Sequence, residues 1–438
     1  MLAELFLILL FALLGTLFGI LTGLIPGIHT NNVALILLSL SPAFIAGFGF
    51  LVAFGVSPEF IMLLVAVMIL SCAIADTFAD FIPAIFLGAP DDDTALSILP
   101  AHSMLLDGRG YEATVLSAVG SFGAIIFGFA LLLPFRFIMG EPVSLYVLLR
   151  NWMVFILIGI SALLILTEHD EFGHRSILIA TFLFLLSGVF GFIVLDMPMS
   201  SPLGVAALSS ALFPALTGLF GLPTLLLSVS SAPEIPEQKT EMRKISKKET
   251  TASILSGSIF GSIMGFLPGV TSAQGTVMSM LARRKKGNEQ VVVTLSSVNT
   301  ANAFFVLVTF FLIMRPRSGA MIAVQQLIPL EAWDGILMPL NLVYLLLAVL
   351  VSAAVSFFAT IWLGRRFAQA FRKIPYAKLN VTIITFLVVL VFAFTGFVGL
   401  LALLVATCIG LIAPMYGVRR SHCMGVLLLP VIVRMMGV

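Results

Sequence analysis

The stretch GTLFGILTGLIPGIHTNN, residues 15–32, is nearly repeated as GSIFGSIMGFLPGVTSAQ at residues 257–274. An ungapped alignment of the two copies matches four glycines, one phenylalanine and one proline. Each copy ends an apolar run with Pro-Gly, where proline removes a helical N–H donor and glycine permits positive φ. The first three glycines of each copy are four residues apart, which predicts a strip without side chains against which another helix packs closely. The stretch therefore predicts that a helix is broken at the same point in two halves of the chain.

The composition indicates a membrane protein. Of the 438 residues, 60% are hydrophobic and only 10% are charged, whereas a soluble protein carries about 25% charged residues. Apolar stretches such as 176–195 and 381–394 recur along the chain, and the longer ones can cross a hydrocarbon core of about 30 Å. Because these runs are continuously apolar rather than alternating, a β-barrel is disfavoured. We predict an all-α polytopic membrane protein with about ten full crossings and two hairpins.

Positive charge is unevenly distributed along the chain. No Lys or Arg precedes Arg109, and later basic residues cluster in segments 239–248, 283–286, 364–378 and 417–420. Basic loops stay on the cytoplasmic side of a membrane. We therefore predict a multi-pass protein of the plasma membrane whose later loops, including 283–286 and 364–378, face the cytoplasm.

One long polar stretch, SAPEIPEQKTEMRKISKKET at 231–250, is rich in Pro, Glu and Lys. This composition is typical of an exposed linker, and its basic residues place it in the cytoplasm. The linker divides the chain into an N-terminal membrane half, residues 1–230, and a C-terminal membrane half, residues 251–438. Each half contains one copy of the repeated phrase.

The two copies differ in the charge at their ends. A helix over roughly 251–267 leaves the basic linker, stops at Pro268-Gly269, and is followed by residues 270–282, which lead to RRKK. Since both ends are expected in the cytoplasm, a re-entrant hairpin is favoured over a straight crossing. The first copy has no basic residue at either end, so the same rule has it entering from the opposite face. We predict an inverted-topology repeat, each half with a Pro-Gly-tipped re-entrant helical hairpin; a tandem repeat of equal orientation is the alternative.

The helix breaks at Pro26-Gly27 and Pro268-Gly269 predict a binding site. In lipid, the N–H and C=O groups freed by a break are tolerated only when they are buried in protein or line a wet cavity. Mostly polar residues follow each break, and the N–H groups of the half-helix that begins there favour anions. Two such tips meeting near the bilayer midplane would bind an anionic substrate. The predicted substrate-binding residues are Gly27, Ile28, His29, Thr30, Asn31 and Asn32 in the first copy and Gly269, Val270, Thr271 and Ser272 in the second.

Two carboxylates lie in an apolar segment of the first half. In SCAIADTFADF, Asp76 and Asp80 are one helical turn apart and share a helix face. Carboxylates within the membrane are costly and usually functional. They are candidates for taking up a coupling proton or Na⁺, and the alternative is that they mark a segment end near water.

The second half offers further polar candidates. SSVNTANAFF resembles AIADTFADFI of the first half, with Asp76-Thr77 opposite Asn299-Thr300, and it also contains Asn302. The segment MRPRSGA that follows carries Arg315 and Arg317, which could hold a carboxylate or phosphate bidentately. We add Asn299, Asn302, Arg315 and Arg317 to the predicted substrate-binding residues. The arginines could instead pair with Asp91–Asp93 or face headgroups, and a metal site at Asp91–Asp93 is disfavoured because no His or further spaced carboxylate supports it.

The sequence resembles the TctA family, the large membrane subunit of tripartite tricarboxylate transporters. The likeness lies in GLIPGIHTNNVALILLSLSP, in FLPGVTSAQGTVMS and in FLGAPDDDTALSILPAHSMLLDGRGYEA. The resemblance implies solute uptake driven by an ion gradient, with an extracytoplasmic binding protein and a small membrane subunit as partners. Carried over by position, the Pro-Gly tips of the family would be Pro26-Gly27 and Pro268-Gly269.

These features together predict a secondary-active transporter with alternating access for an anionic, carboxylate-type small organic acid. The phrase LPGVTSAQGTVM is also similar to the PGVSGGT phrase of bacterial polyprenyl-phosphate translocases, so a flippase for a lipid-linked phosphate is the alternative. An enzyme is disfavoured because no convergent constellation of nucleophile, base or metal ligands occurs. No catalytic residue, resident cofactor, metal or nucleic-acid partner is predicted, and homo-oligomerisation is left open.

Overall fold

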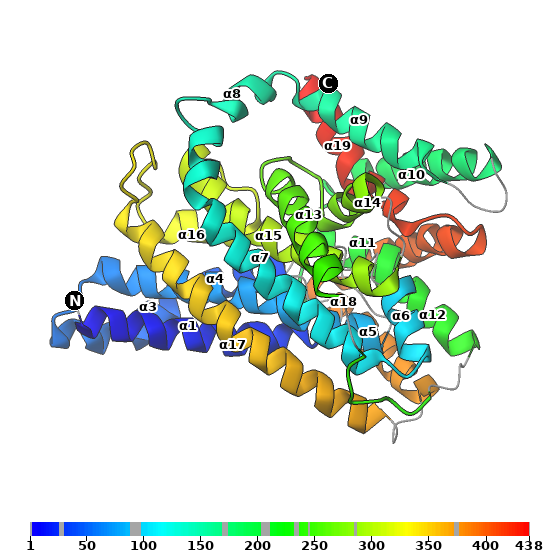
Figure 1. The fold of residues 1–438 in the computed structure, drawn as a ribbon, viewed down its shortest axis with the longest axis horizontal. Coiled ribbons are helices and arrows are strands. Elements are labelled where there is room, and N and C mark those ends of the chain that lie inside the picture. Colours follow the sequence, from blue (N-terminus) through cyan, green and yellow to red (C-terminus); the bar gives the residue numbers. More distant parts are fainter. Residues whose placement is uncertain are drawn as a thin grey trace.

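The computed structural model describes residues 2–25, 30–87, 98–168, 174–202, 211–231, 236–243, 246–283, 287–371 and 376–437. These residues form helices and connecting segments, without a strand among them (Figure 1). The elements that precede the linker are α1 (Leu2–Gly23), α2 (Thr30–Ser39), α3 (Ser41–Gly47), the 3-10 helix η1 (Gly49–Phe54), α4 (Pro58–Ala79), α5 (Phe81–Phe86), α6 (Ile98–Leu106), α7 (Gly110–Met139), α8 (Leu145–Arg150), α9 (Met153–Leu166), α10 (His174–Val194), α11 (Leu212–Leu216), the π-helix η4 (Thr217–Gly221) and α12 (Leu222–Ser231).

The second half contains fewer and longer elements. Its first helix begins at Lys247, inside the polar segment 231–250 that was expected to be a linker. The elements are α13 (Lys247–Met264), α14 (Ser272–Arg283), α15 (Asn288–Ile313), α16 (Gly319–Leu327), α17 (Leu340–Phe371), α18 (Tyr376–Met415), the 3-10 helix η5 (Arg420–Met424) and α19 (Gly425–Met436).

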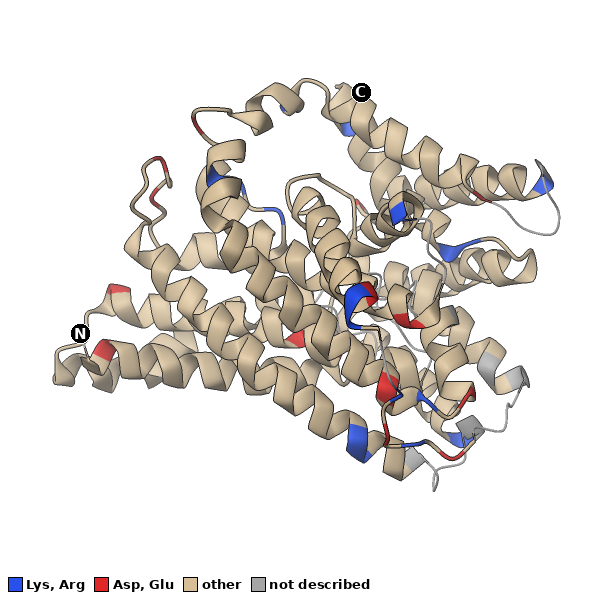
Figure 2. Cartoon of the chain, viewed as in Figure 1, with Lys and Arg blue, Asp and Glu red and all other residues tan. Residues whose placement is uncertain are grey.

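Seven helices among the described residues are long and apolar enough to cross a membrane. Two more apolar helices, Met153–Leu166 and Leu212–Leu227, are shorter, and α18 is interrupted at Gly396, where φ is 64° and ψ is −158°. Charged residues are sparse along these helices and more frequent towards their ends (Figure 2). The predicted class, an all-α polytopic membrane protein, is confirmed. About ten crossings were expected; besides these seven helices, the apolar runs Met153–Leu166 and Leu212–Leu227 form shorter ones, and α18 is broken at Gly396.

The glycine strip of the first repeated phrase packs α1 against α4. A Cβ added at Gly15 would clash with the carbonyl oxygen of Met68, and one added at Gly19 would clash with that of Cys72. At Gly23 the added atom would lie 2.9 Å from the Cβ of Ala79. Residue numbers rise together on the two helices, so α1 and α4 run parallel in close backbone contact.

The strip of the second phrase packs α13 against α15 in the same way. A Cβ at Gly261 would lie 2.6 Å from the carbonyl oxygen of Val298 and 2.7 Å from the Cβ of Ala301. The equivalent Gly19 faces Ala75. Since Ala75 and Ala301 occupy the same place in the two helix pairs, Asp76 corresponds to Asn302. The sequence comparison had set Asp76 opposite Asn299, one turn earlier, because it matched letters rather than packing positions.

Each half also contributes one long helix to the other half. In α17, Ser352 Oγ donates a 2.8 Å hydrogen bond to the carbonyl of Ser71 in α4. In α7, the carbonyl of Gly120 accepts a 3.0 Å hydrogen bond from Ser297 Oγ in α15. Further along the same helices, the ring of Phe60 in α4 packs on that of Tyr344 in α17, and Gly128 in α7 contacts Phe304 in α15. Residue numbers rise together in each case, so α17 runs parallel to α4 and α7 runs parallel to α15.

The helices α7 and α17 run antiparallel to each other. The rings of Phe122 and Phe357 lie 5.1 Å apart, and a Cβ at Gly364 would lie 2.5 Å from the side chain of Thr114. Residue numbers therefore rise along α7 as they fall along α17, which makes the two helices antiparallel. Because α17 is parallel to α4 and α7 is parallel to α15, the group α1–α4–α17 runs opposite to the group α13–α15–α7.

The helices α13 and α14 form a hairpin. Arg283 Nη1, at the end of α14, donates a 2.6 Å hydrogen bond to Ser253 Oγ near the start of α13. One turn further in, the hydroxyls of Ser279 and Ser256 are 3.1 Å apart. The two ends of the hairpin thus lie together, and the turn at Pro268 lies at the other end, beside the middle of α15.

The two halves meet where α4 crosses α15. The hydroxyls of Thr77 and Thr300 are 3.2 Å apart, and Asn299 Nδ2 donates a 3.3 Å hydrogen bond to Asp80 Oδ2. All four of these residues are buried. The crossing therefore joins the halves through polar side chains in an otherwise apolar interior.

Gly19→Ala should destabilise the protein, because the added methyl must displace the α4 backbone. We expect the free energy of unfolding to fall by about 1–3 kcal/mol, the usual cost of overpacking. Thermal unfolding of the purified protein in detergent measures this change. Gly47→Ala is the control, since the added Cβ meets nothing within 4 Å; equal midpoints for the two variants would contradict the packing described.

Candidate functional site

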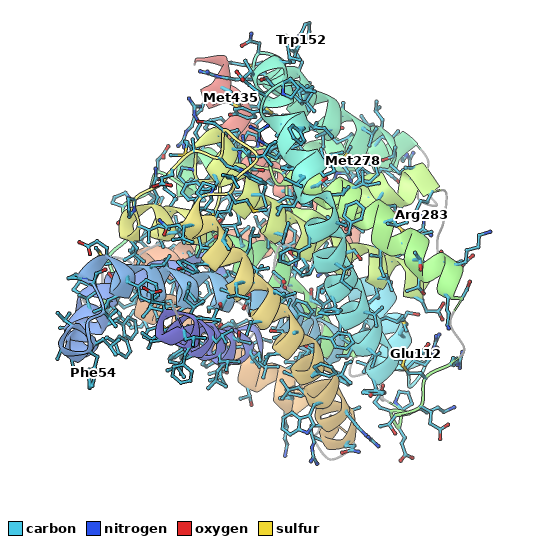
Figure 3. The ribbon with its side chains drawn as sticks, turned by 60° about the vertical axis from the view of Figure 1, so that its left-hand side comes forward. Phe54, Glu112, Trp152, Met278, Arg283 and Met435 are labelled. Carbon is cyan, nitrogen blue, oxygen red and sulfur yellow. The ribbon has the colours of Figure 1, made fainter. Side chains whose placement is uncertain are left out.

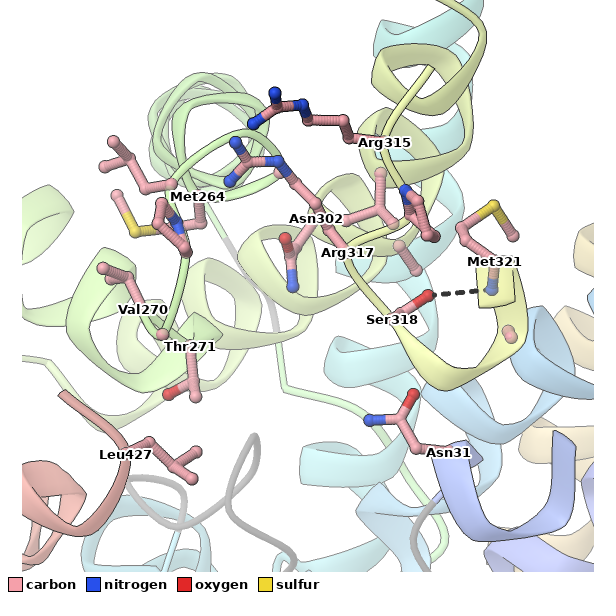
Figure 4. A pocket seen from close by; sticks show the side chains of 18 of the residues that line it. Asn31, Met264, Val270, Thr271, Asn302, Arg315, Arg317, Ser318, Met321 and Leu427 are labelled. Atoms are coloured by element: carbon pink, nitrogen blue, oxygen red, sulfur yellow. Dashed lines mark hydrogen bonds between the residues drawn. The ribbon is translucent and has the colours of Figure 1, made fainter. Parts of the chain in front are cut away.

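A cavity of about 640 Å³ lies between the two halves. This volume falls within the range of about 300–1,000 Å³ that is usual for small-molecule sites. Its walls come from α2 and α4 of the first half, from the α13–α14 turn, α15, α16 and α19 of the second, and from the short helix α8. Figure 4 shows labelled side chains from α2, the α13–α14 turn, α15, α16 and α19 around the same space. The cavity is where several of the predicted site residues meet.

The second Pro-Gly turn forms one wall. Gly269 has a φ of +72°, a conformation that glycine adopts without strain. Val270 and Thr271 line the cavity with Pro268 and Gly269. The helix is broken here, as expected from the sequence: α13 ends at Met264 and α14 begins at Ser272. The irregular backbone between them forms part of the cavity wall.

The start of α14 is capped by its own side chains. Gln274 Oε1 accepts hydrogen bonds from the backbone N of Thr271 at 2.9 Å and from Thr271 Oγ1 at 2.6 Å. One N–H group expected to be free for a ligand is thus already bonded within the protein. Ser272, another predicted contact, is fully buried and does not line the cavity.

The first Pro-Gly pair has described residues only on either side of it. Pro26, Gly27, Ile28 and His29, all predicted site residues, lie outside the described residues, and so does the side chain of Asn32. Thr30 and Asn31 line the cavity. Thr30 Oγ1 donates to Asp76 Oδ2, and Asn31 Oδ1 accepts a 2.8 Å hydrogen bond from Gly319 N at the start of α16. The start of α2 therefore contacts both halves.

The polar residues of the crossing helices divide into two groups. Thr77 of α4 and Asn299 and Asn302 of α15 line the cavity. The carboxylates Asp76 and Asp80 are buried behind this wall, bonded to Thr30 and Asn299 respectively. The predicted coupling residues are thus within one hydrogen bond of cavity-lining side chains.

Arg317 presents a largely desolvated guanidinium to the cavity. Its guanidinium carbon lies 5.6 Å from the ring centre of Tyr146, and Nη2 is 3.5 Å from the tyrosine hydroxyl. Its Nε and Nη1 atoms are buried without a hydrogen-bond partner among the described residues. Burial lowers the pKa of Arg317 from its ordinary value, and Tyr146 opposes this effect. An arginine remains protonated under such conditions, and among the described residues no carboxylate forms an ion pair with this cation.

Arg315 also lines the cavity but is exposed. In Figure 4 the guanidinium groups of Arg315 and Arg317 point the same way, towards the chain at Met264. Two further arginines, Arg150 and Arg434, line the cavity and were not predicted. The signal that could have found them is a single basic residue at the end of an apolar run, in LLRNW and in VIVRMM.

The described residues contain no group of three or more His, Cys, Asp or Glu that could hold a metal ion. Asp91–Asp93, the segment weighed as a metal site and as a partner for the arginines, lies outside the described residues.

The fold and the cavity define a polytopic membrane protein with an arginine-lined cavity between two sets of crossing helices. The chain belongs to the tripartite tricarboxylate transporter TctA family, whose model it matches over residues 9–425. It is also similar to an uncharacterized protein of Methanocaldococcus jannaschii, with 28% identity over 433 residues that cover 97% of this chain and 98% of the relative. No solved structure matches the chain. The family resemblance inferred from the repeated phrases is confirmed, and the family is one of transporter membrane subunits rather than of enzymes.

Gly269→Ala should impair ligand binding or transport while the protein still inserts and folds. The substitution forces an L side chain into positive φ and brings its Cβ within 3.3 Å of Val431 on α19. We expect a loss of about tenfold or more in transport rate, since strain of 1–3 kcal/mol falls on the cavity wall. Reconstituted vesicles loaded with equal amounts of protein provide the measurement.

Gly159→Ala is the matched control, because the added Cβ on α9 meets nothing within 4 Å. Equal transport by the two variants would show that the turn at Gly269 has no part in the function.

Proposed function

We propose that this protein is a secondary-active transporter of an anionic, carboxylate-type small organic acid, which it binds in the cavity between its halves. The observation that carries the proposal is the charge of the cavity wall. Arg150, Arg315, Arg317 and Arg434 line it, and no Asp or Glu does so among the described residues. Arginine presents a rigid fork of donors that matches a carboxylate bidentately.

Substrate contacts are assigned to groups on both sides of the cavity. Arg317 supplies a desolvated charge, and Asn302, Thr271 and Thr30 supply neutral hydrogen-bonding groups around the same space. The buried Nε and Nη1 of Arg317 gain a partner when a carboxylate enters, which removes the cost of leaving them unbonded. Binding thus restores hydrogen bonds rather than merely adding charge attraction.

The two halves are proposed to form an inverted repeat with a re-entrant hairpin in each. Support comes from the equivalent glycine contacts of α1–α4 and α13–α15 and from the opposite directions of the two helix groups. A tandem repeat, in which both halves have the same orientation, would require α7 and α17 to run in the same direction. With its ends beside the basic linker, the α13–α14 hairpin would enter from the cytoplasm and the first hairpin from the other side. Alternating access would then expose the cavity to each side in turn.

Asp76 and Asp80 are proposed to bind the coupling H⁺ or Na⁺. They are buried in a span, where carboxylates are costly unless they have a role. Each is bonded to a residue that lines the cavity, Thr30 for Asp76 and Asn299 for Asp80. A change in the charge or ligation of either carboxylate therefore reaches the cavity wall directly.

The partners follow from the family. A tripartite transporter comprises a binding protein and a small membrane subunit besides the large one, and we propose that this chain acts with both in the plasma membrane. The linker and the basic segments 283–286 and 364–378 would lie in the cytoplasm; the second of these was expected to be a loop, but it contains the end of α17 and the start of α18. The alternative hypothesis is that the substrate is a lipid-linked phosphate, and the binding experiment below distinguishes the two.

Arg317→Gln should weaken anion binding by about 10- to 100-fold, the cost of removing one desolvated charge-assisted contact. Calorimetry on the purified protein in detergent measures the dissociation constants for citrate, succinate, inorganic phosphate and a polyprenyl phosphate. Arg366→Gln is the control, since Arg366 on α17 stacks on Trp362 and does not line the cavity.

Tight binding of the polyprenyl phosphate alone would favour the flippase. The absence of binding by all four probes would reject the proposed function.

Asp76→Asn should uncouple transport from its driving ion. We expect anion exchange between vesicles of equal composition to continue, because no cavity-lining charge is lost. Accumulation driven by a Na⁺ or proton gradient should fall to the background level, because the titratable or ion-binding group is gone. Full gradient-driven accumulation by this variant and by Asp80→Asn would exclude these residues from coupling.

A further inference from the structure

The C-terminal helix α19 forms one side of the cavity. Leu427, Val431, Arg434 and Met435 all line it, and Val431 lies against the turn at Gly269. Figure 3 places Met435 near Trp152 at one end of the molecule, away from Arg283 and Glu112. The last turn of α19 thus brings an arginine to the cavity at that end.

Arg434 differs from the other cavity arginines in having a carboxylate partner. Its Nη2 lies 2.6 Å from Asp196 Oδ1 and 2.8 Å from Oδ2. Among the described residues, neither Arg150, Arg315 nor Arg317 has an ion pair with an Asp or Glu. Asp196 itself does not line the cavity, so it holds the arginine from outside.

The pair is positioned by close packing of the helices that carry it. Asp196 follows α10, and α10 packs tightly on α19: a Cβ at Gly191 would clash with the carbonyl of Val426, and one at Gly188 would meet the side chain of Leu429. Because the backbones are in contact, neither helix can move away from the other without losing this packing. Asp196 is therefore held at a fixed place beside Arg434.

The ion pair is weak enough to be exchanged. The side chains of Arg434 and Asp196 are 56% and 67% exposed, and pairs in such surroundings contribute only about 0–1 kcal/mol. A carboxylate of a ligand held by the other arginines could replace Asp196 at little cost. An exposed pair that merely fastened two helices would add almost nothing to the glycine packing.

We propose that Asp196 is an affinity-determining residue, whose carboxylate competes with the bound anion for the guanidinium of Arg434. In the empty cavity Asp196 neutralises Arg434, and an anion that reaches this arginine must displace it. Asp196 thereby lowers the affinity of the site and favours release of the anion. This inference rests on the proposed anion-binding function of the cavity.

Asp196→Asn tests the competition directly. The dissociation constant of the tightest-binding probe among citrate, succinate and inorganic phosphate should fall by about threefold to fivefold at low ionic strength, as expected from the strength of an exposed pair. The gain should shrink when salt screens the charges. Calorimetry on the full chain in detergent provides the constants. Asp334→Asn, which removes an exposed carboxylate that does not line the cavity, is the control and should leave them unchanged.

Two further variants separate competition from a structural role. Arg434→Gln should weaken binding by a similar factor. The exchange Asp196→Arg with Arg434→Asp restores an ion pair but puts a carboxylate on the cavity wall, so binding should be weaker than in the unaltered protein. Full recovery in the exchanged variant, or equal constants for Asp196→Asn and Asp334→Asn, would overturn the inference.

The outcomes distinguish this inference from the function on which it rests. If the unaltered protein binds none of the probes, the anion-binding function fails and the inference fails with it. If it binds a probe and Arg317→Gln weakens that binding, but Asp196→Asn matches its control, only the role of Asp196 is rejected.

Discussion

The close approach of helix backbones along glycine strips is the constraint on which the structure depends. At Gly19 and Gly261 any side chain would meet the backbone of the partner helix, so α1 lies directly on α4 and α13 directly on α15. Each broken helix is thereby fixed against a continuous one. In the second half this contact ends at the Pro-Gly turn, which places the turn at Gly269 beside the middle of α15 and opens the cavity there. Without the strips, the turn would have no fixed position relative to Asn299 and Asn302.

The charge of the cavity follows from elements that lie far apart in sequence. Arg317 comes from the segment after α15, Arg150 from α8 and Arg434 from α19. Apolar helices supply most of the remaining wall, and the buried guanidinium atoms of Arg317 act in surroundings where charge interactions are stronger than in water. The Gln274 cap changes the part played by the second turn. Because the N–H of Thr271 is bonded to Gln274, the turn would contribute mainly shape in the proposed site, and the arginines would contribute the attraction for an anion.

Sequence reasoning reached the helical membrane class, the family and much of the wall of the second half. Pro268-Gly269 was identifiable because its chemistry is local: proline and glycine break a helix wherever they stand together. Arg150, Arg434 and Tyr146 were missed because a lone basic or aromatic residue at the end of an apolar run is ordinary at a membrane surface. The pairing of Asp76 with Asn299 was a letter match, whereas helix contacts make Asn302 the equivalent residue. Such a register depends on which residues face the partner helix, and a sequence alone does not contain that information.

The exchange of long helices between the halves has a mechanical consequence. The helix α7 of the first half lies along α15, and α17 of the second half lies along α4. Each half therefore packs one long helix against the other half, and the two halves are interlocked. A rigid-body rotation of one half relative to the other would separate α7 from α15 and α17 from α4. In the proposed alternating-access mechanism, the movement would therefore keep these two helix pairs intact as a fixed frame and shift smaller elements beside them. The α13–α14 hairpin belongs to this frame, because its glycine strip holds α13 against α15. The glycine-packed pair α10–α19 touches the hairpin where Val431 meets Gly269, and it belongs to neither interlocking helix pair, so it is the part that can shift while the frame stays in place.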